Sequence, residues 1–182
     1  MKVLRTSLES VLLLEPQVFG DERGFFLESY NRRKFAELGI AEEFVQDNHS
    51  FSVQHTLRGL HYQLNQPQGK LVRAITGIIL DVAVDLRRNS PTFGKSETFL
   101  LSGDNKRMVW IPVGFGHGFR VVSETANVTY KTTGFYSLPD ERTIAWDDPD
   151  LKIDWKLDAP PVLSQKDKLG QRFRDAEVFE ST

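Results

Sequence analysis

The sequence contains no cysteine, no surplus of charge of either sign and no long hydrophobic run. The missing cysteine excludes disulfide bonds, thiolate nucleophiles and thiolate metal ligands. Basic residues number 23 and acidic residues 25, and this net charge of −2 gives no basic excess for binding nucleic acid or an anionic membrane. The short apolar run at residues 11–14 is far shorter than a signal-peptide core or a membrane span. We therefore expect a cytoplasmic protein with no nucleic-acid or membrane partner.

The length and composition are those of one globular domain. Of the 182 residues, 40% are hydrophobic and 26% are charged, and thirteen phenylalanines supply bulky side chains for a core. No internal repeat, low-complexity tract or linker interrupts the chain. We predict a single domain over residues 1–182.

Glycine and proline recur at short intervals, as they do in proteins built from many short strands. The clearest strand is predicted over residues 78–86, where alternation gives one apolar face and one face that carries Asp81 and Asp85. Further strands are predicted over residues 11–15, 24–30, 44–48, 57–63, 71–76, 97–101, 108–111, 119–122 and 128–133.

Helical signals are few. Asn31 can cap a short helix over residues 32–38, which Gly39 would end, and Ser164 can cap a second one that runs toward Gly170. Residues 144–155, punctuated by aspartate and proline, are expected to be irregular. The pattern predicts an all-β fold, either a sandwich or a jelly-roll β-barrel, with a few short helices.

Two of the four histidines stand in unusual settings. His61 lies in the predicted strand 57–63, where regular alternation would point Arg58 and His61 to opposite faces unless Gly59 marks a bulge that re-aims one of them. His117 is flanked by glycines, which let the backbone turn tightly or approach a ligand closely. Taken singly, such histidines are more often surface or hydrogen-bonded core residues than catalysts.

The histidine spacing disfavours a metal site. Metal-binding barrels of the cupin type commonly use a His-x-His pair, but here Tyr62 and Gln63 follow His61. No other two histidines have the spacing of a strand or helix ligand pair. The spacing therefore predicts no zinc or iron site.

Anion-binding candidates are scattered along the chain, and no glycine-rich phosphate loop is present. Arginine binds phosphate through its planar fork and lysine as a point charge, although any one such residue is more often a solvated surface cation. The candidates are Arg23, Arg58, Lys70, Arg73 and Lys166.

Taken together, these segments make the sequence similar to the dTDP-4-dehydrorhamnose 3,5-epimerase family. The resemblance covers nearly the whole chain in order, through ten short motifs. They are 19–26 (FGDERGFF), 44–50 (FVQDNHS), 57–63 (LRGLHYQ), 68–73 (QGKLVR), 81–87 (DVAVDLR), 90–94 (SPTFG), 110–112 (WIP), 117–119 (HGF), 130–133 (YKTT) and 164–167 (SQKD).

The resemblance implies a cupin-type jelly roll that uses no metal, nicotinamide or other cofactor. It implies that the substrate is a dTDP-4-keto-6-deoxyhexose, dTDP-4-dehydro-6-deoxy-glucose, which is epimerised at C3 and C5 to dTDP-4-dehydro-L-rhamnose. It implies a homodimer whose N-terminal strands are exchanged between partners. By motif position, His61 resembles the family's base, Asp167 the carboxylate partner of that base and Tyr130 the acid. The predicted substrate-binding residues are Arg23, Glu28, Gln46, Asp47, Asn48, Arg58, His117, Tyr136, Glu141 and Lys166, and Lys70 is counted with the catalytic residues.

The chemistry of such a substrate explains why no oxidising cofactor would be needed. A ketone at C4 acidifies the C–H bonds at both C3 and C5, since either carbanion spreads into an enolate. Inversion requires one group that removes the proton from one face of the ring and another that returns it to the opposite face. An imidazole such as His61 suits the first role. The phenol of Tyr130 suits the second, especially if a nearby cation lowers its pKa. Lys70 can stabilise the enolate oxygen.

Other activities share these motifs. A single-carbon epimerase or a ketoisomerase of another dTDP-4-keto-6-deoxy sugar would use most of the same residues. A cupin that binds a nucleotide sugar without catalysis, and a metal-dependent cupin oxygenase, are further alternatives, of which the broken His-x-His pair disfavours the last.

Overall fold

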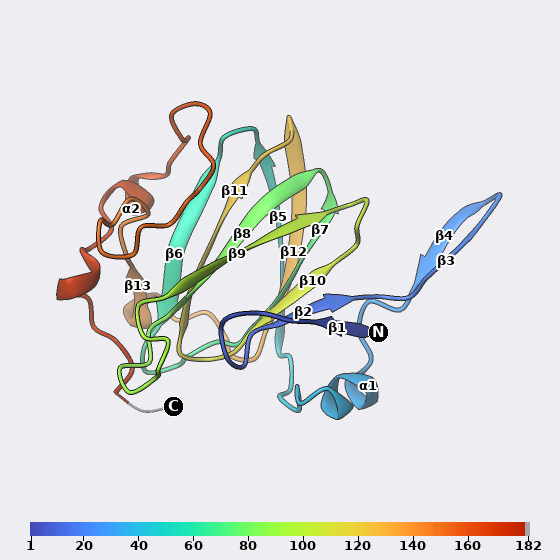
Figure 1. The fold of residues 1–182 in the computed structure, drawn as a ribbon, viewed down its shortest axis with the longest axis horizontal. Coiled ribbons are helices and arrows are strands. Elements are labelled where there is room, and N and C mark those ends of the chain that lie inside the picture. The colour runs from blue at the N-terminus through green and yellow to red at the C-terminus, as the bar shows by residue number, and fades with distance from the viewer. Residues whose placement is uncertain (181–182) are drawn as a thin grey trace.

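The computed structural model describes residues 1–180. Within them the chain forms thirteen strands, two short α-helices and two 3-10 turns (Figure 1). The strands are β1 (Lys2–Leu4), β2 (Leu12–Glu15), β3 (Val18–Asp21), β4 (Gly24–Leu27), β5 (Gln46–Val53), β6 (Leu57–Gln63), β7 (Lys70–Thr76), β8 (Ile78–Asp85), β9 (Ser96–Ser102), β10 (Met108–Ile111), β11 (Phe115–Val121), β12 (Thr125–Thr132) and β13 (Glu141–Thr143). The helical segments are α1 (Arg32–Glu37), α2 (Gln165–Lys168) and the turns η1 (Leu138–Asp140) and η2 (Phe173–Asp175).

Two antiparallel sheets face each other as a flattened jelly roll. The six-stranded sheet has the order β1-β2-β10-β7-β12-β5 and the five-stranded sheet the order β13-β6-β11-β8-β9. Consecutive strands from β5 to β8, and again from β10 to β13, alternate between the two sheets, as a jelly roll requires. The predicted all-β class is confirmed.

Each predicted strand coincides with an observed one, but several boundaries differ. β6 and β10 have the predicted limits, whereas β5 begins two residues later than predicted and continues to Val53. β11 begins at Phe115, so the glycines around His117 lie within a strand and not in a turn. The short strands β1, β3 and β13 were not predicted, because three or four residues carry too little periodic signal.

Both helix caps are confirmed. The Asn31 side chain accepts from the backbone N–H groups of Arg33 and Lys34, and Gly39 follows with φ of +89°. The Ser164 side chain accepts from the Asp167 N–H and opens α2. No helix within residues 1–180 is long and apolar enough to cross a bilayer.

Three hydrophobic clusters hold the sandwich together. The first fills the space between the sheets and includes Val72, Phe99 and Phe119. The second packs the outer face of the five-stranded sheet against the irregular C-terminal segment through Trp155 and Phe179. The third places α1 on the outer face of the six-stranded sheet.

The polar face of β8 is not a solvent face. Asp81 and Asp85 are both fully buried, because the C-terminal segment covers one side of the strand and the opposite sheet covers the other. Asp85 accepts from Arg87, while Asp81 lies against His117. Alternation thus separated the two faces of this strand correctly, but it did not indicate that both are covered.

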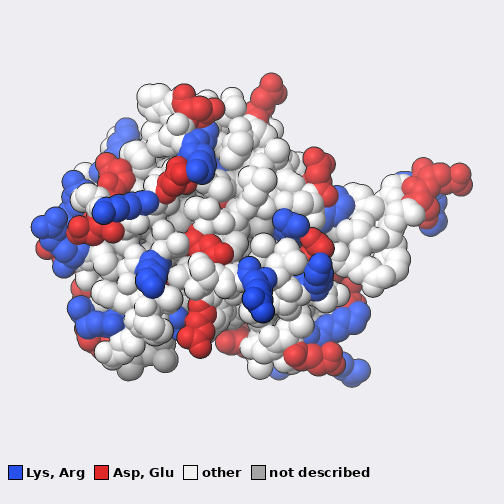
Figure 2. Space-filling model, in the orientation of Figure 1, with Lys and Arg blue, Asp and Glu red and all other residues white. Residues whose placement is uncertain are grey.

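The hairpin β3–β4 projects away from the sandwich as an arm (Figure 1). Phe19, Phe25 and Phe26 on this arm are more than half exposed, as are Phe51 and Val53 on the outer face of the six-stranded sheet. Charged side chains are interspersed by sign over the viewed surface and gather at the tip of the arm (Figure 2). Both apolar surfaces lack a covering element within residues 1–180.

A bulge in β6 turns Arg58 and His61 to the same side. His61 pairs with His117 and Arg58 pairs with Phe119, so the register shifts by one residue between the two pairs. Gly59 lies inside this shift with φ of +114°. The bulge predicted at this glycine is confirmed.

Replacing Gly59 with alanine should destabilise the protein more than the same change at Gly39. Both glycines have positive φ, but a Cβ at 59 would lie 2.6 Å from the Gly118 Cα and from the His117 carbonyl oxygen, whereas a Cβ at 39 meets nothing within 4 Å. We expect Gly59→Ala to lower the free energy of unfolding by roughly 2–5 kcal/mol. Gly39→Ala should cost about 1 kcal/mol. Urea unfolding of both variants measures the difference, and equal losses would contradict the steric explanation.

Candidate active site

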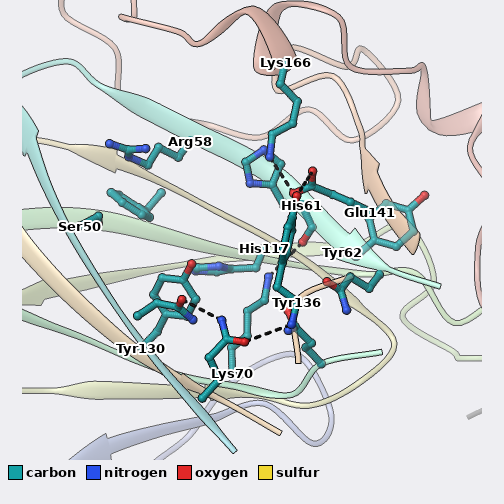
Figure 3. A pocket seen from close by; sticks show the side chains of 15 residues that line it. Ser50, Arg58, His61, Tyr62, Lys70, His117, Tyr130, Tyr136, Glu141 and Lys166 are labelled. Carbon is teal, nitrogen blue, oxygen red and sulfur yellow. Dashed lines mark hydrogen bonds and ion pairs between the residues drawn. The ribbon is translucent and has the colours of Figure 1, made fainter. Parts of the chain in front are cut away.

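A cavity of about 410 Å³ lies between the two sheets and opens to solvent at one end (Figure 3). Both sheets and the segments at its mouth contribute to the wall. The lining residues are Gln46, Asn48, Ser50, Lys70 and Tyr130 from the six-stranded sheet, Arg58, His61, Tyr62, Gln63, His117, Phe119 and Glu141 from the five-stranded sheet, and Gln68, Tyr136 and Lys166 from other segments.

His61 is held from behind by Asp167. The His61 Nε2 lies 2.6 Å from Asp167 Oδ1, which also accepts from the Gly59 N–H, and the Ser164 hydroxyl donates to Oδ2 at 2.6 Å. Burial acts to raise the pKa of the Asp167 carboxyl, but the hydrogen bonds from His61 and Ser164 outweigh it and lower that pKa to about 2. Asp167 is therefore an anion near neutral pH and acts only as an acceptor.

This bond assigns the tautomer of His61. Because Asp167 accepts, the imidazole carries its hydrogen on Nε2, and Nδ1 keeps a free lone pair. Burial lowers the pKa of His61, and Asp167 opposes that shift while Lys166 adds to it. The ring is therefore neutral at neutral pH and able to take up a proton.

Tyr130 faces His61 from the opposite sheet. It lies on β12, His61 lies on β6, and both side chains line the same cavity. Burial raises the pKa of the Tyr130 phenol, and the neighbouring Arg58 only partly counters this. Burial therefore affects this pKa more than the charge of Arg58 does, and the phenol keeps its proton at neutral pH.

Two of the three cations that line the cavity lie at different depths. Lys70 is buried, donates to the His61 carbonyl at 3.3 Å and has a pKa that burial lowers to about 8. The Arg58 guanidinium lies nearer to solvent, where its Nε and Nη2 donate to Ser52 Oγ at 3.1 Å.

The mouth of the cavity carries a linked set of polar side chains (Figure 3). Glu141 accepts from Lys166 at 2.7 Å and from the Tyr136 hydroxyl at 3.2 Å. Gln46 accepts from the Tyr136 backbone N–H and donates to Asn48. These contacts set amide, phenol and charged groups around one opening.

Three predicted residues do not reach the cavity within one chain. Arg23 lies at the tip of the arm, 85% exposed at its side chain and paired with Asp21. Glu28 pairs with Lys34 near the base of the arm, and Asp47 points to the outer face of its sheet. Arg73, one of the anion-binding candidates, also faces outward.

Sequence reasoning missed some of the cavity wall. Ser50 follows Gln46 and Asn48 at alternate positions of β5, and it was overlooked because the predicted strand ended at Asn48. The contribution of Gln63 was likewise available from alternation with His61. Gln68 lies outside any strand, and no local signal points to it. Within residues 1–180, no three His, Asp or Glu side chains are grouped so as to hold a metal ion.

The comparisons with known proteins all point to the same family. Residues 5–175 match the family model described as dTDP-4-dehydrorhamnose 3,5-epimerase. A dTDP-4-dehydrorhamnose 3,5-epimerase of Pseudomonas aeruginosa is 58% identical over 98% of this chain and 99% of its own length.

Solved structures give the same result. An epimerase from Legionella pneumophila in complex with dTDP-4-keto-L-rhamnose superposes with a TM-score of 0.95 at 46% identity, covering 97% of this chain and 94% of its own. A 3'-monoepimerase from Streptomyces bikiniensis in complex with dTDP-quinovose superposes with a TM-score of 0.87 at 29% identity, covering 93% of this chain and 86% of its own.

Replacing Asp167 with asparagine should lower the pKa of His61 further. The carboxylate favours the protonated imidazole, so its loss leaves burial and Lys166 less opposed. NMR titration of the histidine ring signals measures this directly, with the His61 signal assigned from its absence in His61→Asn. A His61 titration midpoint that is unchanged or raised in Asp167→Asn would contradict the tautomer and pairing described above.

Proposed function

The chain belongs to the dTDP-4-dehydrorhamnose 3,5-epimerase family, and on that basis we infer that it converts dTDP-4-dehydro-6-deoxy-glucose to dTDP-4-dehydro-L-rhamnose. The reaction inverts C3 and C5. The observation that carries the inference is the approach of His61 and Tyr130 to one cavity from opposite sheets. A hexose between them would present one face to each residue, as inversion demands.

His61 is the proposed base. Its Nδ1 takes the proton from C5 or C3. The electron pair of the broken C–H bond forms a double bond to C4, and the C4 carbonyl oxygen takes up the negative charge of the enolate. Asp167, already hydrogen-bonded to the imidazole, stabilises the imidazolium that forms. The lowered pKa of His61 supports this role, since the ring is neutral before the reaction.

Tyr130 is the proposed acid. Its phenol returns a proton to the opposite face of the same carbon while the enolate collapses to the ketone. The raised pKa of Tyr130 means that the proton is present at neutral pH, and it makes the resulting phenolate a strong base. Exchange with solvent then restores the imidazole and the phenol for the second carbon.

Lys70 is proposed to stabilise the enolate oxygen at C4. It is the buried ammonium of the cavity, and in a site shielded from water a fixed positive charge stabilises a developing oxyanion strongly. It also lies next to the backbone of His61. The negative charge therefore forms between the base and a cation.

The remaining wall residues suit the nucleotide. Arg58 and Lys166 can meet the diphosphate, while Gln46 and Asn48 offer amide groups to the thymine. Tyr136 adds a half-exposed aromatic ring beside the opening. His117 and Glu141 remain predicted ligand contacts from the same wall.

A homodimer would explain the residues that the single chain leaves outside. The exposed phenylalanines of the arm and the apolar outer face of the six-stranded sheet are surfaces that a second copy can bury together. We propose that Arg23 and Glu28 of the partner subunit complete each cavity. Ligand binding by Asp47, and the cytoplasmic location, stay predictions.

Running the reaction in D₂O should separate the base from the acid. His61→Ala should abolish deuterium incorporation at C3 and C5, since no group removes the proton. Tyr130→Phe should permit some exchange but block net inversion, with turnover reduced by about 10²–10⁴. NMR of the product reads both results.

The same spectra test the substrate assignment. Inversion at both carbons supports the proposed reaction, while inversion at only one indicates a monoepimerase. A 3-keto product would indicate a ketoisomerase, and binding of dTDP without any exchange would indicate a non-catalytic protein. Normal turnover by His61→Ala would refute the assignment of the base.

Mixing two inactive variants should restore activity if the arm acts in the partner's site. In a heterodimer of Arg23→Ala and His61→Ala subunits, one cavity has both defects, while the other has an intact His61 and an intact arm. Each heterodimer should therefore have one working cavity, which is about half of the activity of a wild-type dimer. Refolding the variants together and measuring turnover provides the test; if each variant stays inactive in the mixture, the arm does not cross between subunits.

A further inference from the structure

The segment 134–137 carries Tyr136 at the mouth of the cavity, but it has little structure of its own. It follows the end of β12 and is neither helix nor strand. Within residues 1–180, the backbone groups of residues 134–136 make no hydrogen bond to another backbone group. Phe135 and Tyr136 are more than half exposed, so apolar packing does not hold them in place. The shape of the segment therefore depends on side chains that bond to its backbone.

Gln63, the last residue of β6, bonds to the backbone on both sides of Tyr136. Its Oε1 accepts from the Ser137 N–H at 2.8 Å. Its Nε2 donates to the Phe135 carbonyl at 3.2 Å and to the Gln66 carbonyl at 2.7 Å. Because an N–H only donates and a carbonyl only accepts, these partners also fix the orientation of the amide. The side chain is buried, and it joins the Tyr136 segment to the end of a central strand.

Two more glutamines hold the same segment. Gln46 on β5 accepts from the Tyr136 N–H at 3.1 Å through its Oε1, and Gln68 donates from its Nε2 to the Gly134 carbonyl at 2.7 Å. Since β5 and β6 belong to different sheets, the segment is attached to both walls of the cavity. We call this set the glutamine clamp; it consists of Gln46, Gln63 and Gln68.

The clamp relates the position of Tyr136 to that of the proposed base. Gln63 follows His61 by two residues on β6, and both side chains line the cavity. Gln63 also pairs across the sheet with Glu141, which accepts from the Tyr136 hydroxyl at 3.2 Å (Figure 3). Cross-strand neighbours thus hold Tyr136 at its backbone and at its hydroxyl.

We propose that Gln63 is a positioning residue of this active site, which holds Tyr136 at the mouth of the cavity in the geometry that receives the nucleotide sugar. Its oxygen and both of its amide hydrogens already have partners in the protein, so it acts through Tyr136. The inference rests on the proposed function in one respect, since it takes Tyr136 as a contact of the ligand.

The benefit of the clamp is that the segment is ordered before the ligand arrives. A segment without these bonds would lose conformational freedom at each binding event, and that entropy would be subtracted from the affinity. His61 and Tyr130 lie within β6 and β12, so they keep their places when the segment loosens. Loss of Gln63 should therefore weaken binding more than it slows proton transfer.

Hydrogen exchange tests the clamp without any substrate. Gln63→Met removes the three hydrogen bonds but leaves Gln46, the partner of the Tyr136 amide, in place. If the clamp holds the segment as a unit, the Tyr136 amide should nevertheless exchange about tenfold faster or more. Gln54→Met is the matched control, because the Gln54 amide donates to the Val122 carbonyl in a turn outside the cavity. This control should leave the Tyr136 amide at the wild-type rate.

Calorimetry with dTDP measures the effect on binding. The Kd should rise about tenfold in Gln63→Met and stay at the wild-type value in Gln54→Met. Gln68→Met should raise it less, because the Gly134 carbonyl still accepts from the Thr132 hydroxyl.

Turnover distinguishes positioning from a general loss of structure. With dTDP-4-dehydro-6-deoxy-glucose, Gln63→Met should raise KM about tenfold while lowering kcat less than about threefold. A variant that merely lowered the fraction of folded enzyme would reduce kcat and leave KM unchanged.

A variant with a carboxyl in place of the amide adds a pH signature. In Gln63→Glu, an ionised carboxyl can accept from the Ser137 N–H but cannot donate to the Phe135 carbonyl, whereas a protonated one can do both. The ratio of its dTDP Kd to that of wild type should fall by about threefold or more from pH 8.5 to pH 5.5. The same ratio for Gln63→Met should not change with pH. If Gln63→Met does not fold, this comparison decides alone, and a constant ratio for Gln63→Glu would overturn the proposal.

The measurements also separate this proposal from the proposed reaction. Wild type that fails to turn over the sugar, together with the expected exchange and dTDP binding in the Gln63 variants, would refute the reaction and support the clamp. Wild type that turns the sugar over, with Tyr136 exchange and KM equal in Gln63→Met and Gln54→Met, would refute the positioning role of Gln63.

Discussion

The hydrogen bond between His61 on β6 and Asp167 on α2 joins residues that are 106 positions apart in the chain. It ties α2 and the C-terminal segment to the five-stranded sheet, which that segment covers with a hydrophobic cluster. The same bond assigns the hydrogen of the imidazole to Nε2. The attachment of the C-terminal segment and the orientation of the His61 ring therefore depend on the same contact, and weakening the segment's packing would also disturb the ring.

The net charge of this protein is small, and its charged groups are important where they gather at the cavity. The chain is nearly neutral, and its surface charges are interspersed, yet the cavity and its floor contain a lysine, a carboxylate and two histidines in close succession. Burial shifts the pKa values of His61, Lys70 and Asp81 toward the neutral form, and a nearby group of opposite charge opposes each shift. Two buried aspartates contact the histidines of this site: Asp81 lies against His117 and Asp167 against His61.

Local patterns predicted much of the fold. Strand positions, both helix caps and the bulge at Gly59 depend on a few neighbouring residues, so the chain alone indicates them. The extent of β5 could not be predicted in this way, because its second half is exposed on one side and continues only through its pairing with β12. The protruding arm was predicted as a single strand, since a four-residue hairpin partner leaves little periodic trace.

The sequence by itself determined the fold class and many of the residues that line the cavity, because side-chain alternation and motif order are properties of the chain. Tertiary structure decided which of them meet. It brought Tyr130 across from His61 on the opposite sheet, left Arg23 on an arm outside the cavity, and buried Asp81 beneath it. These outcomes depend on the packing of one sheet against another and on the removal of water, and neither is encoded in the spacing of neighbouring residues.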